Sequence, residues 1–385
     1  MRTEIAAIAA SAILALAAIY AMLVLIAVLV WRARRPRYAT GSLPPVTVLK
    51  PLCGAEPGLY AHLRSYCEQD YPEFQLIFGV RDPADPALAV VARLVSEFPQ
   101  LPIDVVVNAQ QHGSNCKISN LINMTECARH DLLVMADSDT WVRPDYLKSV
   151  TAPFLDRGVG LVTCVYCDVP TTGVWSRVGA MYINEWYVPL VVLGWLFGHR
   201  AYVSGQTLCV RRATLEAVGG LPALADQLAD DYRLGELVRA QGLRIVLSPY
   251  LVHAEHHEPD LDALTYHELR WMSTIRVLQP LSFAFLFASF TLPLALLGAT
   301  LIPAEPSSLA TLLWALVAVA IAARLLVHLV HRLGGDRPLL ADLWLLPLRD
   351  LLLAWFWCRS FFTSRITWRG NEFAVDSAGI MRRVS

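Results

Sequence analysis

Between residues 46 and 140 the chain alternates short apolar runs with longer mixed stretches. Four apolar runs are bounded by polar or turn-forming residues, as is typical of strands buried on both faces: 46–49, 74–80, 103–107 and 132–136. Stretches with helical spacing separate them, at 57–68, 87–98 and 118–128. Strands and helices that alternate with short connections predict an α/β domain with a mainly parallel, doubly wound sheet.

A less regular pattern continues to residue 259. Further strands are predicted at 160–166, 208–210 and 244–247, and the pair Asp230-Asp231 opens a helix. Between them, residues 174–202 are rich in Trp and Tyr. Such a segment is typical either of a membrane–water interface or of an ordinary aromatic core, and the sequence leaves both interpretations open.

Long apolar runs lie outside this domain. Residues 5–31 carry no charge, and the run is long enough to cross a hydrocarbon core of about 30 Å. It is also too long for the apolar region of a cleavable signal peptide. After an amphipathic helix at 260–279, residues 281–302 and 309–330 predict two more membrane-spanning helices. Residues 339–362 are apolar but interrupted by charges, which favours interfacial or re-entrant helices.

Basic residues predict the topology of these segments. Arg32, Arg34, Arg35 and Arg37 follow the first apolar run, which places the following domain in the cytoplasm by the positive-inside rule. Two later crossings return the chain to the same side, where the polar, basic tail 363–385 ends it. The high Ala, Arg and Leu content is typical of bacteria, so the expected location is the bacterial inner membrane, with several crossings.

The composition agrees with a membrane protein. Of the 385 residues 55% are hydrophobic and 17% charged, which is too apolar for an ordinary soluble protein. The net charge of −1 gives no general attraction to nucleic acid. The eight cysteines are scattered and many sit in apolar runs, so free thiols are expected rather than disulfides.

Two carboxylates directly follow the apolar run 132–136. In open α/β sheets ligands bind outside the carboxyl ends of the strands, and Asp137 and Asp139 point to the same side of an extended segment. Neighbouring oxygen ligands suit Mg²⁺ or Mn²⁺, which carboxylates and substrate phosphates usually hold together. The alternative is that one aspartate caps the next helix and the other is solvated.

Six short motifs occur in order along the chain. They are Leu49-Lys50-Pro51-Leu52; Asp82 within residues 80–87; Asn115-Cys116-Lys117-Ile118-Ser119-Asn120-Leu121; Asp137-Ser138-Asp139; Asp230-Asp231-Tyr232; and His267-Glu268-Leu269-Arg270-Trp271. From Val46 to Arg276 the chain thereby resembles the membrane-anchored, inverting glycosyltransferases of the GT-A fold. It most closely resembles ceramide glucosyltransferases and bacterial hopanoid-biosynthesis glycosyltransferases. His267 departs from the family's Gln or Arg.

The resemblance implies a reaction and a first set of residues for it. A sugar passes with inversion from a UDP-sugar to a hydroxyl of a membrane lipid. Asp137 and Asp139 hold a divalent cation that stabilises the leaving diphosphate. Asp231 is the general base, with Asp230, or a helix-capping role for Asp231, as the alternative. Apart from the resemblance, His253, His256 and His257 form a cluster in which His253 is the best candidate for a third metal ligand; the alternative is that these histidines are solvated or lie on the acceptor side.

The resemblance also implies a substrate-binding set: Asp82, Lys117, Gln206, His267, Arg270 and Trp271. Asp82 would bind uracil or ribose and Lys117 the uridine or the phosphates. Arg270 would place a planar cation against the diphosphate. Trp271 would stack its ring on the sugar or close off the acceptor, and Gln206 would line the acceptor pocket. The alternatives are a turn aspartate at Asp82, a helix-surface lysine at Lys117, and an interfacial arginine and tryptophan.

We therefore expect a transferase of N-acetylglucosamine or glucose, with UDP-sugar, lipid acceptor and bilayer as its partners and no nucleic acid. Composition favours a hopanoid polyol as the acceptor; ceramide, a processive polysaccharide synthase and an inactive scaffold are the alternatives. The segments expected are a transmembrane anchor (1–31), a basic linker (32–45), a cytoplasmic GT-A catalytic domain (46–259), an interface helix (260–280), two transmembrane helices (281–331), and interfacial or re-entrant helices with a tail (332–385).

Overall fold

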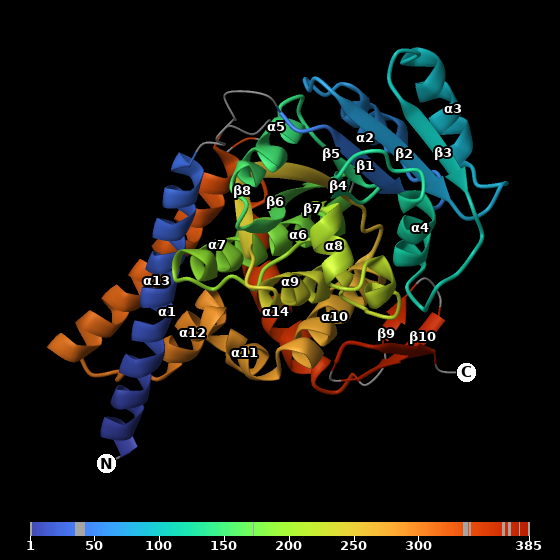
Figure 1. Cartoon of the computed structure of the whole chain (residues 1–385). Helices are drawn as coiled ribbons and strands as arrows, with labels where there is room; N and C mark the ends of the chain where they lie inside the picture. The colour runs from blue at the N-terminus through green and yellow to red at the C-terminus, as the bar shows by residue number, and fades with distance from the viewer. Residues whose placement is uncertain are drawn as a thin grey trace. The chain divides into compact units, whose positions relative to one another are not determined.

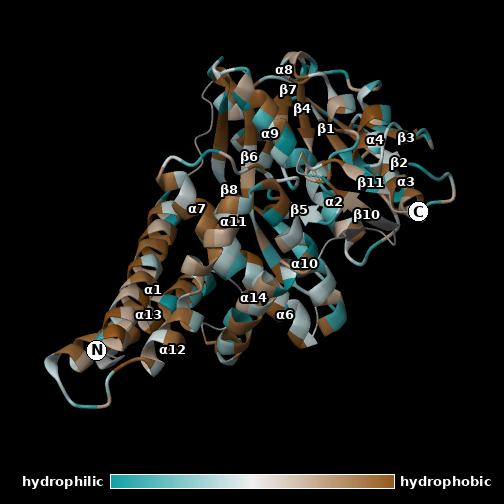
Figure 2. Ribbon diagram, turned by 90° about the horizontal axis from the view of Figure 1, so that it is seen from below, coloured by the Kyte–Doolittle hydropathy of each residue, from teal (hydrophilic) through white to brown (hydrophobic). Residues whose placement is uncertain are grey.

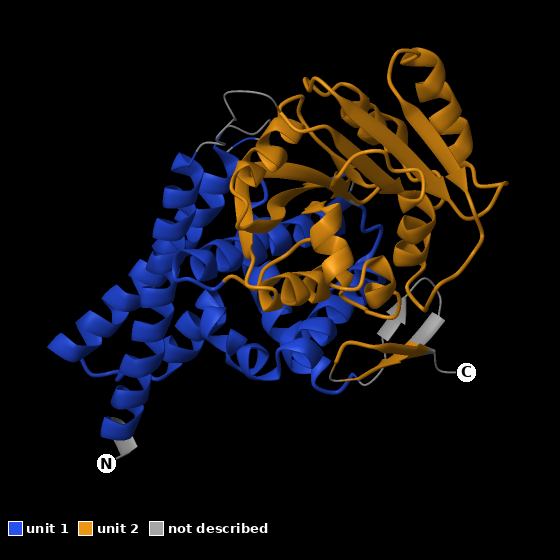
Figure 3. Ribbon diagram, in the orientation of Figure 1, with its two compact units in different colours: residues 1–34, 170–199, 256–366 blue, residues 35–169, 200–255, 367–385 orange. Residues whose placement is uncertain are grey.

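The computed structural model describes residues 2–34, 43–171, 173–333, 338, 340–363, 366–368, 371–376 and 378–383. The chain forms two compact units (Figure 3). Unit 1 comprises residues 1–34, 170–199 and 256–366, and unit 2 comprises residues 35–169, 200–255 and 367–385. Most of the predicted basic linker, residues 35–42, lies outside the described residues.

Unit 2 is built on an eight-stranded sheet with the order β3-β2-β1-β4-β7-β6-β8-β5 (Figure 1). Its strands are β1 Val46–Pro51, β2 Phe74–Val80, β3 Ile103–Val107, β4 Leu132–Met135, β5 Thr140–Trp141, β6 Val159–Pro170, β7 Leu208–Arg211 and β8 Arg244–His256. Its helices are α2 Leu59–Cys67, α3 Ala87–Glu97, α4 Cys116–Thr125, α5 Tyr146–Thr151, η1 Ala152–Leu155, α8 Arg212–Ala217, η3 Leu221–Leu224 and α9 Asp230–Ala240.

The predicted α/β fold is confirmed, and its register explains where the site lies. Strands β3, β2, β1 and β4 are parallel, so their carboxyl ends meet at one edge of the sheet. The apolar runs form these strands because β1, β2 and β4 are almost wholly buried. Strand β4 pairs antiparallel with β7, with Leu208 opposite Met135, and β7 pairs antiparallel with β6. The residues just before β7 therefore lie beside the end of β4.

Unit 1 is helical. Its elements are α1 Arg2–Ala33, α6 Gly173–Tyr182, the π-helix η2 Ile183–Tyr187, α7 Val188–Leu196, α10 Leu261–Leu278, α11 Pro280–Ala284, η4 Phe285–Ser289, α12 Thr291–Thr300, α13 Ser308–Arg332, η5 Leu343–Leu345 and α14 Leu346–Ser360. Among the described residues, α1 and α13 are long and apolar enough to cross a membrane, and Figure 2 shows hydrophobic residues along both. This supports the expected membrane protein.

Small side chains bring the apolar helices of unit 1 together. Ala17 and Ala18 of α1, Ala295 of α12 and Ala320 of α13 form one buried cluster. A Cβ added to Gly298 would lie 2.6 Å from Leu14, so α12 and α1 approach closely at this glycine. Close backbone approach at small residues is the usual way in which helices associate in membranes.

Several sequence-based predictions change in the structure. The segment 281–302 is not one straight helix, because the pair Pro280–Ser289 and Thr291–Thr300 bends by 62° at Phe290. The predicted strand 244–247 continues to His256, since its pairing with β5 extends it. The tail contains β9 Ile366–Trp368, β10 Asn371–Val375 and β11 Met381–Arg383, a three-stranded sheet that the sequence did not predict.

Candidate active site

A lysine and two aspartates from three elements of unit 2 meet at the carboxyl edge of the sheet. Lys117 lies in the first turn of α4, which the buried Asn115 caps by accepting a hydrogen bond from the Ile118 amide at 3.1 Å. The Nζ atom of Lys117 lies 2.6 Å from Oδ1 of Asp137, a residue that follows β4. It also lies 3.8 Å from Oδ2 of Asp230, which is the first residue of α9. Residues far apart in sequence thus share one site.

Gly205 holds Asp231, the residue after Asp230, at the same site as Lys117. The Gly205 amide donates a hydrogen bond to Oδ2 of Asp231 at 2.9 Å. A Cβ on Gly205 would lie 2.9 Å from Nζ of Lys117, 3.3 Å from Oδ2 of Asp137 and 3.7 Å from Oδ2 of Asp231. Three charged groups therefore surround the open face of this glycine. The sequence analysis missed Gly205, although its position before Gln206 and a predicted strand was visible.

The close approach at Gly205 makes it sensitive to substitution. Gly205→Ala should destabilise the protein by about 1 kcal/mol, the low end for overpacking, because the added methyl forces the flexible Lys117 side chain away from its acidic partners. Unfolding of the full chain in detergent by chemical denaturant measures this. Gly194→Ala is the matched control, since a Cβ there makes only ordinary contacts at 3.6 and 3.9 Å. Equal stability of the two variants would contradict the crowding inferred at Gly205.

Burial and charge set the protonation of this site. Burial, together with the neighbouring Asp230, raises the pKa of Asp231 to about 6. Burial and the neighbouring Asp137 likewise raise the pKa of Asp139 to about 7. Burial alone would lower the pKa of Lys117, but Asp137 and Asp230 outweigh it and raise that pKa, so Lys117 stays a cation. The site therefore combines a fixed positive charge with a carboxylate that titrates near neutral pH.

Lys50, on strand β1, supports the loop that carries Asp137 and Asp139. It is fully buried on β1 and donates to the backbone carbonyl of Asp137 and, at 3.2 Å, to Oγ1 of Thr140. Its ammonium also lies 3.8 Å from the centre of the Tyr66 ring. Burial lowers the pKa of Lys50 to about 7. The sequence shows this lysine within the motif Leu49-Lys50-Pro51-Leu52 but does not indicate its role.

The donor set at Asp137 and Asp139 fits a divalent cation. Oδ1 of Asp139 is buried and has no hydrogen-bond partner, which leaves a desolvated oxygen for a ligand. Within the described part of the chain, no group of three or more His, Cys, Asp or Glu side chains is arranged to hold a metal. His253 instead pairs with Trp141 across β8 and β5 and stacks on it at 5.3 Å. A cation here would rely on two carboxylates and substrate phosphates.

Asp82 and Gln206 have local partners in unit 2. Asp82 is exposed just after β2, one strand removed from β4, and accepts a hydrogen bond from the Ala84 amide at 2.8 Å. That is the turn role that the sequence left open. Gln206 accepts a hydrogen bond from the Ser204 hydroxyl and directly follows Gly205.

The remaining predicted residues lie on α10 in unit 1. Trp271 stacks on Tyr182, with ring centres 5.5 Å apart, and on His267, at 6.1 Å. The His267 ring also contacts the buried carboxylate of Glu258. Arg270 lies between these aromatic positions in sequence and is partly buried. These residues form an aromatic and basic face of α10.

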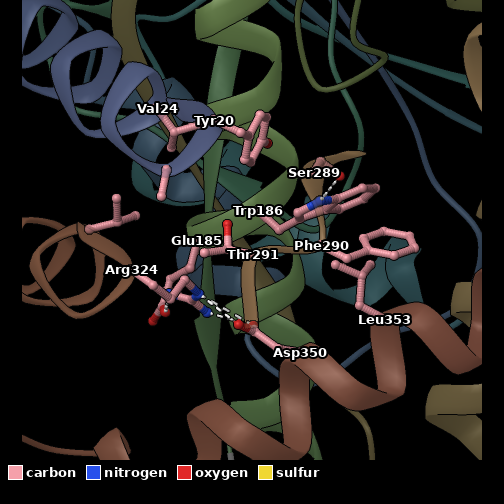
Figure 4. A pocket seen from close by; sticks show the side chains of 12 residues that line it. Tyr20, Val24, Glu185, Trp186, Ser289, Phe290, Thr291, Arg324, Asp350 and Leu353 are labelled. Carbon is pink, nitrogen blue, oxygen red and sulfur yellow. Dashed lines mark hydrogen bonds and ion pairs between the residues drawn. The ribbon is translucent and has the colours of Figure 1, made fainter. Parts of the chain in front are cut away.

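Unit 1 also contains buried charges between its apolar helices. Arg324 of α13 donates to Asp350 of α14 at 2.9 Å and to Glu185 of η2 at 3.0 Å, and Glu185 also contacts His328 at 2.8 Å. Figure 4 shows Arg324, Glu185 and Asp350 converging on one side of a pocket whose other walls include Tyr20, Trp186 and Phe290. Ionisable groups are costly between membrane helices unless paired, and this pairing joins α13, η2 and α14.

Known proteins resemble the chain over most of its length. The model of glycosyl transferase family 21 matches residues 9–381. Ceramide glucosyltransferase 1 of Caenorhabditis elegans is 24% identical over 211 residues, which cover 54% of this chain and 45% of that protein. Ceramide glucosyltransferase 3 of the same organism is 23% identical over 357 residues, covering 88% and 74%. The chain thus spans under half of the first relative's length and about three quarters of the second's.

A solved structure shares the fold. It is a mannosyltransferase from Pyrobaculum calidifontis in complex with GDP-Man and Mn²⁺, with a TM-score of 0.54 and 19% identity, covering 93% of this chain and 98% of that one. The similarity agrees with the predicted GT-A fold. The ordered motifs, the fold and the match over residues 9–381 lead to one assignment: the chain belongs to glycosyl transferase family 21.

Proposed function

We propose that this chain is an inverting glycosyltransferase that moves glucose or N-acetylglucosamine from a UDP-sugar to a hydroxyl of a membrane lipid. Family membership supports the class of reaction. The observation that carries the proposal is the meeting of Lys117, Asp137 and Asp231 around Gly205. Two apolar helices, α1 and α13, support a lipid acceptor, because they keep the enzyme in the bilayer where that acceptor dissolves.

The residues of the site divide the chemistry between them. Asp231 takes the proton of the acceptor hydroxyl, and its pKa near 6 leaves it deprotonated at neutral pH. Lys117 stays charged and neutralises the leaving diphosphate. A divalent cation, Mg²⁺ or Mn²⁺, held by Asp137 and Asp139 would supply Lewis-acid stabilisation of the same group.

Five further residues complete the proposed binding set. Asp82 binds the uracil or ribose, and Gln206 borders the acceptor. On α10, Arg270 contributes a planar cation for phosphate, while Trp271 and His267 offer stacked rings to the sugar or the acceptor.

The proposal has two candidate lipid acceptors, ceramide and a hopanoid polyol. The names of the C. elegans relatives support ceramide. The bacterial composition of the sequence supports a hopanoid polyol, with the catalytic unit on the cytoplasmic face of the inner membrane.

An assay of the purified full chain tests the proposal. The chain, in liposomes that contain ceramide or a hopanoid polyol, receives UDP-glucose or UDP-N-acetylglucosamine, and mass spectrometry identifies the product. A lipid carrying one sugar supports the proposal. A polymer indicates a polysaccharide synthase, and no product with any pair indicates an inactive scaffold.

The proposed base gives the reaction a definite pH dependence. Because Asp231 accepts a proton only as a carboxylate, kcat/KM should fall about tenfold per unit as the pH drops below about 6. An aspartate at its ordinary pKa of about 3.9 would keep full activity down to about pH 5. Steady-state assays of the full chain in buffered liposomes measure the profile. A flat profile between about pH 5 and 7 would show that the base titrates below this range, which contradicts the raised pKa of Asp231.

A further inference from the structure

Asn115 joins the two elements that carry the charged groups of the site. Besides capping α4, its side-chain amide donates to the Gln227 carbonyl at 2.9 Å and to Oδ1 of Asp230 at 3.3 Å. Its backbone amide donates to the Ala225 carbonyl at 2.8 Å. Asn115 and Asp230 are both buried. The segment from Ala225 to Asp230 therefore determines where α9, and with it Asp231, lies relative to Lys117.

The end of the chain binds this same segment from another side. The Leu228 amide donates to the Gly379 carbonyl at 3.0 Å, and the Met381 amide donates to the Asp226 carbonyl at 2.9 Å. Gln227 and Ile380 form an antiparallel bridge between these two bonds. Met381 is 2% exposed, so this contact is a packed one. A strand more than 140 residues away in sequence thus pairs with the three residues that lead into α9.

A carboxylate holds the tail in the shape that this pairing needs. Oδ1 of Asp376 accepts hydrogen bonds from the amides of Ala378 and Ile380, each at 3.0 Å. Gly379 adopts a φ of +79°, which glycine favours, and β10 pairs antiparallel with β11. The turn is therefore built by its own residues before it meets Asp226 and Leu228.

We propose that Asp376, Gly379, Ile380 and Met381, which we call the C-terminal clasp, position Asp231 and Lys117 for sugar transfer without touching a reactant. The inference rests on the proposed function. Pairing with the clasp fixes Asp226 and Leu228, and Asn115 passes this restraint to α4. Small displacements of reacting groups reduce rates strongly, because transfer needs the base and the charged lysine in place together. The clasp is thus a positioning element for the reaction.

A chain that ends at Val375 tests the clasp. We expect kcat to fall about 10- to 100-fold and the KM for the UDP-sugar to rise, because Asp231 and Lys117 are both displaced. A variant that merely unfolds in part would lower kcat and leave KM unchanged. Hydrogen exchange should also become faster at the amides of residues 226–232. Unchanged kcat, KM and exchange in the shortened chain would overturn the proposal.

A matched pair of substitutions covers the case in which the shortened chain fails to fold. Asp376→Asn keeps the Oδ1 acceptor for the turn amides and should behave like the unaltered chain, whereas Asp376→Ala should show the lower kcat and the higher KM. Equal kinetics for the two variants would overturn the clasp. If the unaltered chain transfers no sugar, the proposed function fails. The rates of amide hydrogen exchange at residues 226–232, compared between Asp376→Asn and Asp376→Ala, still decide whether the clasp exists.

Discussion

Replacing Asp231 with asparagine should lower kcat about 10²- to 10⁴-fold, the range in which general-base catalysis contributes. The asparagine side-chain oxygen can still accept the hydrogen bond from the Gly205 amide, whereas the hydrogen bond that Oδ1 of Asp231 accepts from the Tyr232 amide at 2.7 Å is lost. What it cannot do is take a proton from the acceptor hydroxyl. The measurement is initial rates of glycolipid formation by the purified full chain at saturating UDP-sugar and acceptor.

Asp230→Asn is the control for this substitution. Asp230 faces Lys117 and Asn115 and adjoins Asp231, so its loss removes a similar charge without removing the base. We expect a smaller fall in kcat for this control. If Asp230→Asn were the more damaging change, or if Asp231→Asn kept its rate, then the base would have been assigned to the wrong residue.

Arg349→Met should destabilise unit 1 by about 3–5 kcal/mol, because it leaves the carboxylate of Glu268 buried without its cation. Arg349 is 1% exposed and Glu268 is fully buried, and Nη2 of Arg349 lies 2.7 Å from Oε2 of Glu268. Methionine keeps most of the apolar volume, so the lost charge dominates the effect. Denaturant unfolding of the detergent-solubilised chain, followed by the signal of the helical unit, measures the loss.

The double variant Arg349→Met with Glu268→Leu separates charge from packing. Removing both charges should restore much of the stability, because replacement of a buried ion pair by apolar side chains is often neutral. Arg382→Ala is the exposed control and should change little. A single variant as stable as the unaltered chain would mean that the pair does not hold α10 and α14 together. Glu268 belongs to the motif of His267, Arg270 and Trp271, so the pair also bears on the placement of these residues.

Much of the catalytic fold could be predicted because short buried strands leave an unambiguous pattern. The runs 74–80 and 103–107 became β2 and β3 with unchanged bounds; β2 is buried along its whole length, whereas β3 is a partly exposed strand at the edge of the sheet. Asp137 and Asp231 could be located near strand and helix ends by the same reasoning. Their shared surroundings could not be derived from local pattern, because they depend on the antiparallel pairing of β7 with β4.

Other features depend on long-range contacts that leave little trace in sequence. The bend at Phe290 interrupts an apolar run that reads as one continuous helix. Gly205 became important only because Lys117 and two aspartates approach it from other elements. The clasp consists of an aspartate, a glycine and two apolar residues without a distinctive motif, and its role arises from backbone pairing between residues 226–228 and 379–381. Backbone pairing of this kind does not require particular side chains.

The configuration of the new glycosidic bond tests the central claim most directly. The full chain in liposomes is given a UDP-sugar whose anomeric carbon is α-linked, and proton NMR of the purified glycolipid reports the product linkage. Our account predicts a β-linked single sugar, because Asp231 directs the lipid hydroxyl to the face opposite the leaving diphosphate. An α-linked product, or release of UDP with no glycolipid, would contradict it.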